Sequence, residues 1–139
     1  MAHTLKDVMT SNVVSLPAGS SVTEAARAMR DSGIGDVVVT DDNKIAGIVT
    51  DRDITVRTVA EGKNPDQVHL SDICSGNLTT LSPSDDISKA VQVMRDKALR
   101  RLPVVDNGKA VGIVSIGDLA MERDSESALA DISAAKPNA

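Results

Sequence analysis

Apolar residues follow two different periods along this chain, and the periods alternate. In residues 22–29 and 87–94 they recur at i, i+3, i+4 and i+7, which predicts two amphipathic helices with one buried face each. The apolar positions are Val22, Ala25, Ala26 and Met29 in the first stretch and Ile87, Ala90, Val91 and Met94 in the second. Short apolar runs before them, Val13–Leu16 and Leu78–Leu81, end at clusters of Pro, Ser, Gly or Asp and are typical of strands.

A hairpin is expected after each of these helices. Val37–Thr40 and Lys44–Val49 flank the turn Asp41-Asp42-Asn43, and Leu102–Val105 and Lys109–Val114 flank Asn107-Gly108. Both central residues of a type I′ turn need positive φ, which Asn, Asp and Gly adopt most readily. A final helix is then expected to begin at Thr50 in the first half and at Ser115 in the second.

Polar residues mark the beginnings of the earlier helices. Ser21 with Glu24 fits a capping box, and Asp86 is a plausible N-cap for the second amphipathic helix. A short opening helix precedes each strand, at Leu5–Met9 and at Leu70–Cys74. Each half of the chain therefore reads as opening helix, strand, helix, two strands and helix.

The two halves are copies of one another. Sliding residues 5–55 against residues 70–120 without a gap gives identical residues at 15 of 51 positions. We predict repeats at residues 5–60 and 70–124, a linker at 61–69, and a C-terminal tail at 125–139 that extends the last helix or docks on a partner. A unit of roughly fifty residues buries little surface alone. Residues 1–124 are therefore expected to form one α/β (α+β) module, packed sheet against sheet about a pseudo-twofold axis.

Composition excludes several classes of partner. The formal net charge is −5, with 15 Lys and Arg against 20 Asp and Glu, which disfavours a nucleic-acid duplex as ligand. The chain has no Phe, Tyr or Trp on which single-stranded bases could stack. No run approaches the roughly 18 apolar residues of a membrane span, and residues 1–9 lack the features of a secretory signal. A cytoplasmic location is predicted.

The chain also lacks the usual signs of catalysis and of metal binding. Cys74 is the single cysteine, and the two histidines, His3 and His69, lie in a terminus and a linker. No nucleophile is paired with a base, and no phosphate-binding glycine loop is present. We predict no catalytic residues, no metal site and no enzyme activity.

One strand-to-helix junction is written twice. Residues 47–53 read GIVTDRD and residues 112–118 read GIVSIGD, so that Thr50 and Ser115 are each followed three positions later by Asp53 or Asp118. In one interpretation the junctions are helix caps. Each hydroxyl is then the N-cap, and each carboxylate stabilises the helix by roughly 0.3–1 kcal/mol through its interaction with the helix dipole. Against this interpretation, the reciprocal capping box prefers the longer Glu or Gln at the third position. The alternative is a ligand site, and the two overlap because amides at a helix N-terminus bind anions.

These motifs resemble the cystathionine-β-synthase (CBS) domain, and two in tandem resemble a Bateman module. The resemblance rests on both junctions, on the preceding hairpins and on the segment Leu102-Pro103-Val104-Val105-Asp106, and it covers about residues 5–120. It implies a regulatory module without catalytic activity that senses an adenosine-containing ligand, such as AMP, ADP, ATP or S-adenosylmethionine, as in cellular energy sensing. It implies no cofactor beyond this regulatory ligand, and an output through a separate, unknown protein.

The resemblance also assigns roles to residues. Asp53 and Asp118 would bind the ribose hydroxyls, and Thr50 and Ser115 would lie near the phosphates. The walls of the first base site would be Val14, Val37 and Val38; those of the second would be Thr80, Leu102 and Pro103. The resemblance implies a homodimer, because two paired modules of family members form a disc. The apolar residues of the final helices also predict a homodimer.

Positive charge is distributed unequally between the copies. Arg52 in the first junction faces Gly117 in the second, and Arg100 and Arg101 replace Gly35 and Asp36. These arginines are either phosphate ligands or solvated surface residues. Asp36 would repel a phosphate, and Val38 replaces the family's proline, so the second site is expected to be the better one. The rival hypothesis is a ligand-free dimeric interaction or stress-response scaffold with the same fold.

Overall fold

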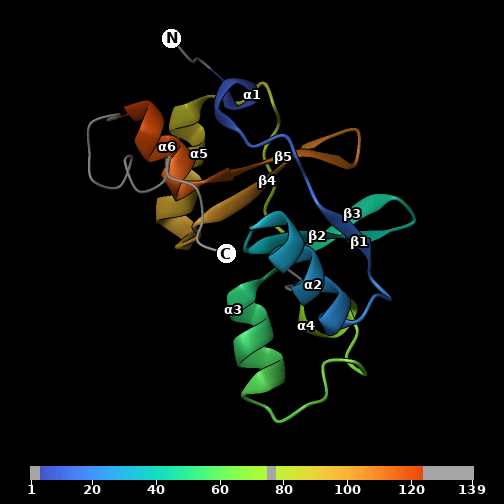
Figure 1. Cartoon of the computed structure of the whole chain (residues 1–139). Coiled ribbons are helices and arrows are strands. Elements are labelled where there is room, and N and C mark those ends of the chain that lie inside the picture. Colours follow the sequence, from blue (N-terminus) through green and yellow to red (C-terminus); the bar gives the residue numbers. More distant parts are fainter. Residues whose placement is uncertain (1–3, 75–77, 124–139) are drawn as a thin grey trace. The chain divides into compact units, whose positions relative to one another are not determined.

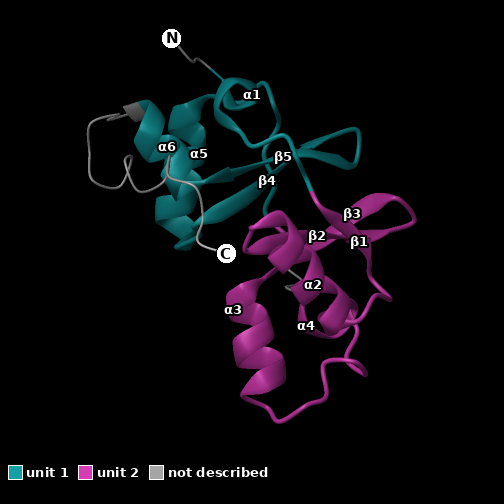
Figure 2. Cartoon of the chain, viewed as in Figure 1, with its two compact units in different colours: residues 1–13, 79–136 teal, residues 14–78, 137–139 magenta. Residues whose placement is uncertain are grey.

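The computed structural model describes residues 4–74 and 78–123, and the chain divides into two compact units (Figure 2). Unit 1 joins residues 1–13 to residues 79–136, and unit 2 consists chiefly of residues 14–78. The predicted C-terminal tail, residues 125–139, lies outside the described residues. Within the described ranges no helix is long and apolar enough to span a membrane.

Unit 2 is a three-stranded sheet with helices on it (Figure 1). Its elements are β1 (Ser15–Pro17), α2 (Val22–Ser32), β2 (Asp36–Asp41), β3 (Lys44–Thr50), α3 (Asp51–Ile54), the π-helix η1 (Thr55–Val59) and α4 (Leu70–Ile73). The strand order is β1-β2-β3, with β1 parallel and β3 antiparallel to the central β2. A core of apolar side chains from α2, α4 and the strands holds this unit together.

Unit 1 repeats this plan with a smaller sheet. Its elements are α1 (Leu5–Val8), α5 (Ile87–Lys97), β4 (Arg101–Asp106), β5 (Lys109–Ser115) and α6 (Ile116–Arg123). β4 and β5 form an antiparallel pair, and Leu81 makes a parallel bridge to Val104 where the other unit has β1. The mixed helix and strand content confirms the predicted α+β class.

The opening helix of each repeat packs in the unit built on the other repeat. Leu5 of α1 lies in the core of unit 1, and Leu70 of α4 lies in the core of unit 2, each with 0% of its surface exposed. The Leu5 amide donates to the Asp85 carbonyl at 3.0 Å, and the Leu70 amide donates to the Ser20 carbonyl at 2.9 Å. Burying one leucine contributes about 1.5–3 kcal/mol. The compact units are thus offset from the sequence repeats by one helix.

The chain that leaves α1 runs along β5. Thr10 and Ile113 exchange two backbone hydrogen bonds of 2.9 Å. Gly112 accommodates this approach, because a Cβ added there would clash with the Met9 side chain and lie 3.1 Å from the Thr10 carbonyl oxygen. The shared glycine of the repeated motif therefore has a packing reason in unit 1.

Most of the local predictions are confirmed. Both hairpins turn through two residues of positive φ, Asp42-Asn43 (55° and 64°) and Asn107-Gly108 (53° and 79°). Ser21 caps α2 by accepting the Glu24 amide at 3.1 Å. Asp86 is the N-cap of α5, without a side-chain cap hydrogen bond. The opening helices each end one residue before the predicted limit.

Three local predictions are wrong in detail. The strand expected at Val13–Leu16 lies at Ser15–Pro17, because pairing with β2 sets its register. The strand expected at Leu78–Leu81 is reduced to the single bridge at Leu81. Ala26 is exposed although the helical period places it on the apolar face, because the buried stripe of α2 is narrow and runs through Val22, Ala25 and Met29.

Candidate functional site

The two repeated junctions form the same reciprocal capping box. In unit 2 the Asp53 amide donates to Thr50 Oγ1 at 3.1 Å, and the Thr50 amide donates to Asp53 Oδ2 at 2.9 Å. In unit 1 the Asp118 amide donates to Ser115 Oγ at 3.1 Å, and the Ser115 amide donates to Asp118 Oδ2 at 2.9 Å. The general preference for Glu or Gln at the third position therefore does not prevent aspartate from closing the box here.

Aspartate side chains also accept backbone amides at the beginnings of other helices and turns. Asp7, Asp72 and Asp85 each accept the backbone amide of the residue three positions earlier, at 3.3, 3.0 and 2.8 Å. The N-terminal amides need such acceptors because they have no partner inside the helix. One oxygen of each junction aspartate is thus used structurally, and the other oxygen decides what else the residue does.

The second oxygen meets different surroundings in the two units. Asp53 Oδ1 lies 4.0 Å from Nε of Arg57, one helical turn later in the chain. The equivalent position in unit 1 holds Glu122, four residues after Asp118, where a like charge is mildly unfavourable. Among the side chains that the structure describes, no lysine or arginine forms an ion pair with Asp118. The Asp118 carboxylate therefore keeps more capacity to accept a donor from a ligand.

The predicted residues of the second site gather at one end of the unit 1 sheet. Arg101 begins β4 opposite Ser115, which ends β5. The Ile116 amide of α6 donates to the Arg100 carbonyl at 2.9 Å, so the backbone of Arg100 lies next to the start of this helix. Arg100 is exposed, and Arg101 is half-buried. The backbone of both arginines thus lies next to the N-terminus of α6, whose amide ends favour anions.

The residues predicted to form the walls of this site differ in how far their side chains are exposed to solvent. The Leu102 side chain is 1% exposed and belongs to the core of unit 1. Pro103 is buried on the alternate side of β4, and its carbonyl accepts the Leu81 amide at 3.1 Å. Thr80, next to Leu81 in the chain, is exposed. Of the three side chains, only that of Thr80 is open to solvent.

In unit 2 the corresponding residues also meet at one end of the sheet. Thr50 lies opposite Asp36 across β2 and β3, and the Val38 amide donates to the Val14 carbonyl at 2.9 Å. Val37 belongs to the core, and Val38 is 1% exposed. Arg52 projects from the exposed first turn of α3. An acidic residue therefore stands where unit 1 has Arg101.

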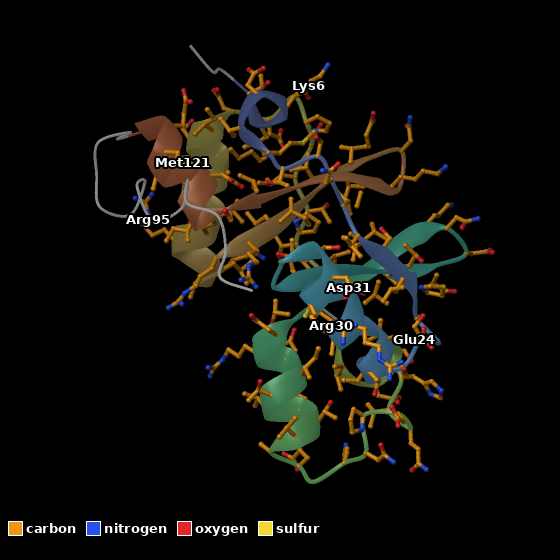
Figure 3. All side chains as sticks on the ribbon, viewed as in Figure 1. Lys6, Glu24, Arg30, Asp31, Arg95 and Met121 are labelled. Carbon is orange, nitrogen blue, oxygen red and sulfur yellow. The ribbon has the colours of Figure 1, made fainter. Side chains whose placement is uncertain are left out.

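Unit 1 also has an apolar hollow, whose lining does not include the residues of the predicted site. It has a volume of about 360 Å³ and is lined by Val91, Met94, Arg95, Leu99, Ile116, Leu119 and Ala120. It lies on the α5 and α6 face; Figure 3 labels Arg95 on α5 and Met121 on α6. Ile116 at its edge is 49% exposed. Neither Asp118 nor Ser115 lines the hollow, so it is not the predicted nucleotide site.

Sequence reasoning missed Arg57. Its spacing of four residues from Asp53 on a helix is the signal that could have identified the pair.

The described residues contain no group of three His, Cys, Asp or Glu side chains that could hold a metal ion. His69 instead begins α4 as its N-cap.

The family model of the CBS domain matches the chain twice, at residues 5–58 and 70–124. The protein MK0525 of Methanopyrus kandleri is 44% identical over 98 residues, which are 69% of this chain and 50% of that protein. The chain thus spans half the length of that relative. The CBS domain-containing protein YhcV of Bacillus subtilis is 37% identical over 133 residues, 93% of this chain and 94% of that protein.

Solved structures share the fold. The CBS-domain containing protein ATU1752 from Agrobacterium tumefaciens has a TM-score of 0.78 at 31% identity, over 88% of this chain and 95% of that one. The CBS domain pair of protein MJ0100, in complex with 5′-methylthioadenosine and S-adenosyl-L-methionine, has a TM-score of 0.79 at 23% identity, over 89% and 98%. With two matches that cover most of its length, the chain belongs to the CBS-domain family, as a tandem pair of CBS domains.

Proposed function

We propose that this CBS pair is a regulatory module that binds an adenosine-containing ligand, without catalysis, and signals to a separate partner protein. The binding residues are those of the unit 1 junction first: Asp118, Ser115, Arg100 and Arg101, with Thr80 and the main chain of Leu102 and Pro103 beside the base. The junction of unit 2 is the weaker site.

One observation carries this proposal. The Asp118 carboxylate uses Oδ2 to cap α6, and no described lysine or arginine side chain is paired with it. The hydroxyls of a ribose are donors that this carboxylate can accept, and a charged hydrogen bond contributes about 1.5–3 kcal/mol. The start of α6 and the two neighbouring arginines favour the phosphate of the same ligand.

Adenosine chemistry fits the apolar character of the strands. With no aromatic side chain in the sequence, a flat base has to lie against aliphatic groups and main-chain amides. The MJ0100 domain pair holds two adenosine-containing molecules on the same fold. At 23% identity that likeness concerns the fold alone, so the choice of ligand here rests on the residues of the junction.

The expected affinity is moderate. AMP has about 23 non-hydrogen atoms, and roughly 0.3 kcal/mol per atom gives about −7 kcal/mol, a dissociation constant on the order of 10 μM. Nanomolar binding of AMP by calorimetry would contradict this picture of a site without aromatic stacking.

A thermal-shift screen tests the proposal. The purified protein is heated with AMP, ADP, ATP, NAD or S-adenosylmethionine, with inorganic phosphate as the control for a simple anion effect. A ligand at a hundredfold excess over its dissociation constant adds about 2.7 kcal/mol to the free energy of unfolding. We expect a rise in Tm with at least one adenosine compound and none with phosphate. No rise with any of them overturns the proposal.

A second candidate function is a ligand-free dimeric scaffold for interaction or stress response. The completed capping boxes favour it, because they give both junction aspartates a structural purpose without any ligand. The same screen separates the two candidates, since the scaffold shows no shift with any nucleotide.

Both candidates include a homodimer. Apolar side chains remain exposed on the final helices of both repeats: Ile116 at 49%, Val56 at 45% and Val59 at 63%. We expect light scattering at micromolar concentration to give twice the monomer mass. Ile116→Asp, at the edge of the apolar hollow, is expected to weaken the dimer. A wild-type monomer contradicts the prediction.

A further inference from the structure

Arg57 makes two contacts that neither the cap nor the proposed ligand requires. Its Nη1 donates to the Ile73 carbonyl at 3.0 Å in a half-buried position. Its Nε lies 4.0 Å from Asp53 Oδ1. Ile73 is the last residue of α4 and is 1% exposed in the core of unit 2. One guanidinium therefore donates a hydrogen bond to the end of a helix from the next repeat and lies at ion-pair distance from the repeated junction.

We propose that Arg57 is a positioning residue that ties the Asp53 carboxylate to the C-terminal end of α4. A guanidinium suits this because its planar fork can donate to a carbonyl while its positive charge attracts a nearby carboxylate. The carbonyls at a helix end carry partial negative charge and are favourable partners for a cation. A change in the charge of Asp53, or the binding of a ligand to its carboxylate, is thereby transmitted to the end of α4.

The tie belongs to one repeat only. The position equivalent to Arg57 holds Glu122 in unit 1, where a carboxylate cannot donate to a carbonyl. Arg57 therefore is not part of the general plan of the repeat. It gives unit 2 a link between its junction and α4, and α4 opens the segment that the family model assigns to the second domain.

The chain supplies its own probe of this link. Cys74 follows Ile73 directly, is the C-cap of α4, and is partly buried against the core of unit 2. Its amide donates to the Leu70 carbonyl at 2.9 Å. Since it is the single cysteine of the chain, its rate of reaction with a thiol reagent reports how often the end of α4 opens.

The experiment measures the rate of Cys74 labelling by dithionitrobenzoate, without nucleotide, in the full chain. Arg57→Gln removes the charge and the fork, Arg57→Lys keeps the charge, and Asp53→Asn removes the anionic partner. Arg27→Gln, an exposed arginine of α2 in the same unit, is the matched control. Melting curves of each variant show that labelling is compared in folded protein.

We expect Arg57→Gln to speed labelling by about three- to tenfold, the scale of one half-exposed charged hydrogen bond lost. Arg57→Lys is expected to lie between this variant and the wild type, and the control to match the wild type. If Arg57→Gln labels within twofold of the wild type, or if the control speeds labelling equally, the tie does not exist. Should Arg57→Gln fail to fold, Asp53→Asn takes its place: losing the anionic partner is expected to speed labelling, and a rate within twofold of the wild type counts against the tie.

A second arm adds saturating AMP and rests on the proposed function. AMP is expected to change the labelling rate of the wild type and to leave that of Asp53→Asn unchanged. If AMP raises the Tm of Asp118→Ala, whose remaining intact junction is that of unit 2, but leaves its labelling rate unaltered, the transmission from Asp53 is overturned while the nucleotide-binding proposal stands. If AMP does not raise Tm, the proposed function loses its support while the measurements without nucleotide still decide the role of Arg57.

Discussion

The two junctions are the same structure in different electrostatic surroundings. Each hydroxyl and each aspartate exchange hydrogen bonds of 3.1 and 2.9 Å, so the caps of units 1 and 2 are equal in geometry. Asp53 then shares its other oxygen with Arg57, while Asp118 is followed one turn later by Glu122. Duplication has preserved what the backbone needs and changed what a ligand would meet.

The two junctions separate the structural role of an aspartate from a functional one. Closing a cap needs one carboxylate oxygen, and both copies satisfy that need. Binding a ligand needs the second oxygen and nearby cations, and these differ between the copies. Measurements that compare the two units therefore test function with the cap as an internal control.

The largest expected effect is on nucleotide binding by Asp118→Ala. Losing the charged acceptor of the ribose hydroxyls is expected to weaken AMP ten- to a hundredfold, about 1.5–3 kcal/mol. Asp53→Ala, which loses an equal cap, is expected to affect affinity less. Calorimetry on both variants checks this, and a silent Asp118→Ala beside an inactive Asp53→Ala would reverse the ranking of the sites.

The double change Arg100→Ala with Arg101→Ala is the companion variant. It leaves the Asp118 cap intact, so it is expected to reduce the preference for AMP over adenosine while barely changing Tm. If both aspartate variants bind AMP normally and only melt earlier, the junctions are helix caps alone.

The next effect concerns packing around a glycine of the repeated motif. In unit 1, Gly112→Ala places a Cβ against the Met9 side chain and the Thr10 carbonyl. We expect a loss of about 1–3 kcal/mol in the free energy of unfolding, because overfilling a close contact forces a shift of the chain. Gly19→Ala in unit 2 is the control, since nothing lies within 4 Å of the added atom. Urea denaturation that finds the two variants equal would contradict the close approach.

A smaller effect of opposite sign is expected at Thr58 in unit 2. Its hydroxyl oxygen is buried with no hydrogen-bond partner among the described residues, and the residue is 0% exposed. Thr58→Val replaces the hydroxyl by a methyl group of similar size and is expected to stabilise the chain by about 1 kcal/mol. Thr55→Val on the same π-helix is the control, because the Thr55 hydroxyl donates to the Asp51 carbonyl at 3.0 Å. A lower Tm for Thr58→Val would show that the hydroxyl is satisfied.

The smallest effect compares the ends of the two amphipathic helices. α2 ends at Gly33 with φ 64°, and α5 ends at Ala98 with φ 54°, each in the left-handed conformation. Alanine is strained there and glycine is not, so Ala98→Gly is expected to raise stability by about 0.5–1 kcal/mol. Gly33→Ala is the reciprocal variant and is expected to lower stability by a similar amount. Thermal melts that move both variants in the same direction would contradict this explanation.

Surface pairs contribute less than any of these changes. Arg30 and Asp31 are neighbours on α2 with a 2.9 Å contact, and their side chains are 70% and 66% exposed (Figure 3). Such exposed pairs contribute little because water screens them. Arg95 and Asp96 form the same dipeptide on α5, where Arg95 Nε lies 4.0 Å from Asp96 Oδ1. Conservation of this dipeptide between the repeats therefore does not mark a functional site.

Features that depend on neighbouring residues could be predicted from the sequence. The positive φ of Asn107-Gly108, the cap at Ser21 and the beginning of the last helices at Thr50 and Ser115 each follow from side chains within one turn of the backbone they stabilise. The duplication extended these local rules to both halves of the chain. It also indicated the family, which the paired matches confirm.

Which distant segments meet could not be predicted in this way and depends on the packing of the folded chain. Leu5 and Leu70 are identical in side chain and period, so either helix is equally suited to either core, and connectivity together with backbone pairing sends each to the unit of the other repeat. The Arg57 link to Ile73 likewise joins residues sixteen positions apart. Local periodicity fixes which face of an element is apolar, but many apolar faces are interchangeable, and the choice among them is made by contacts that no short stretch of sequence contains.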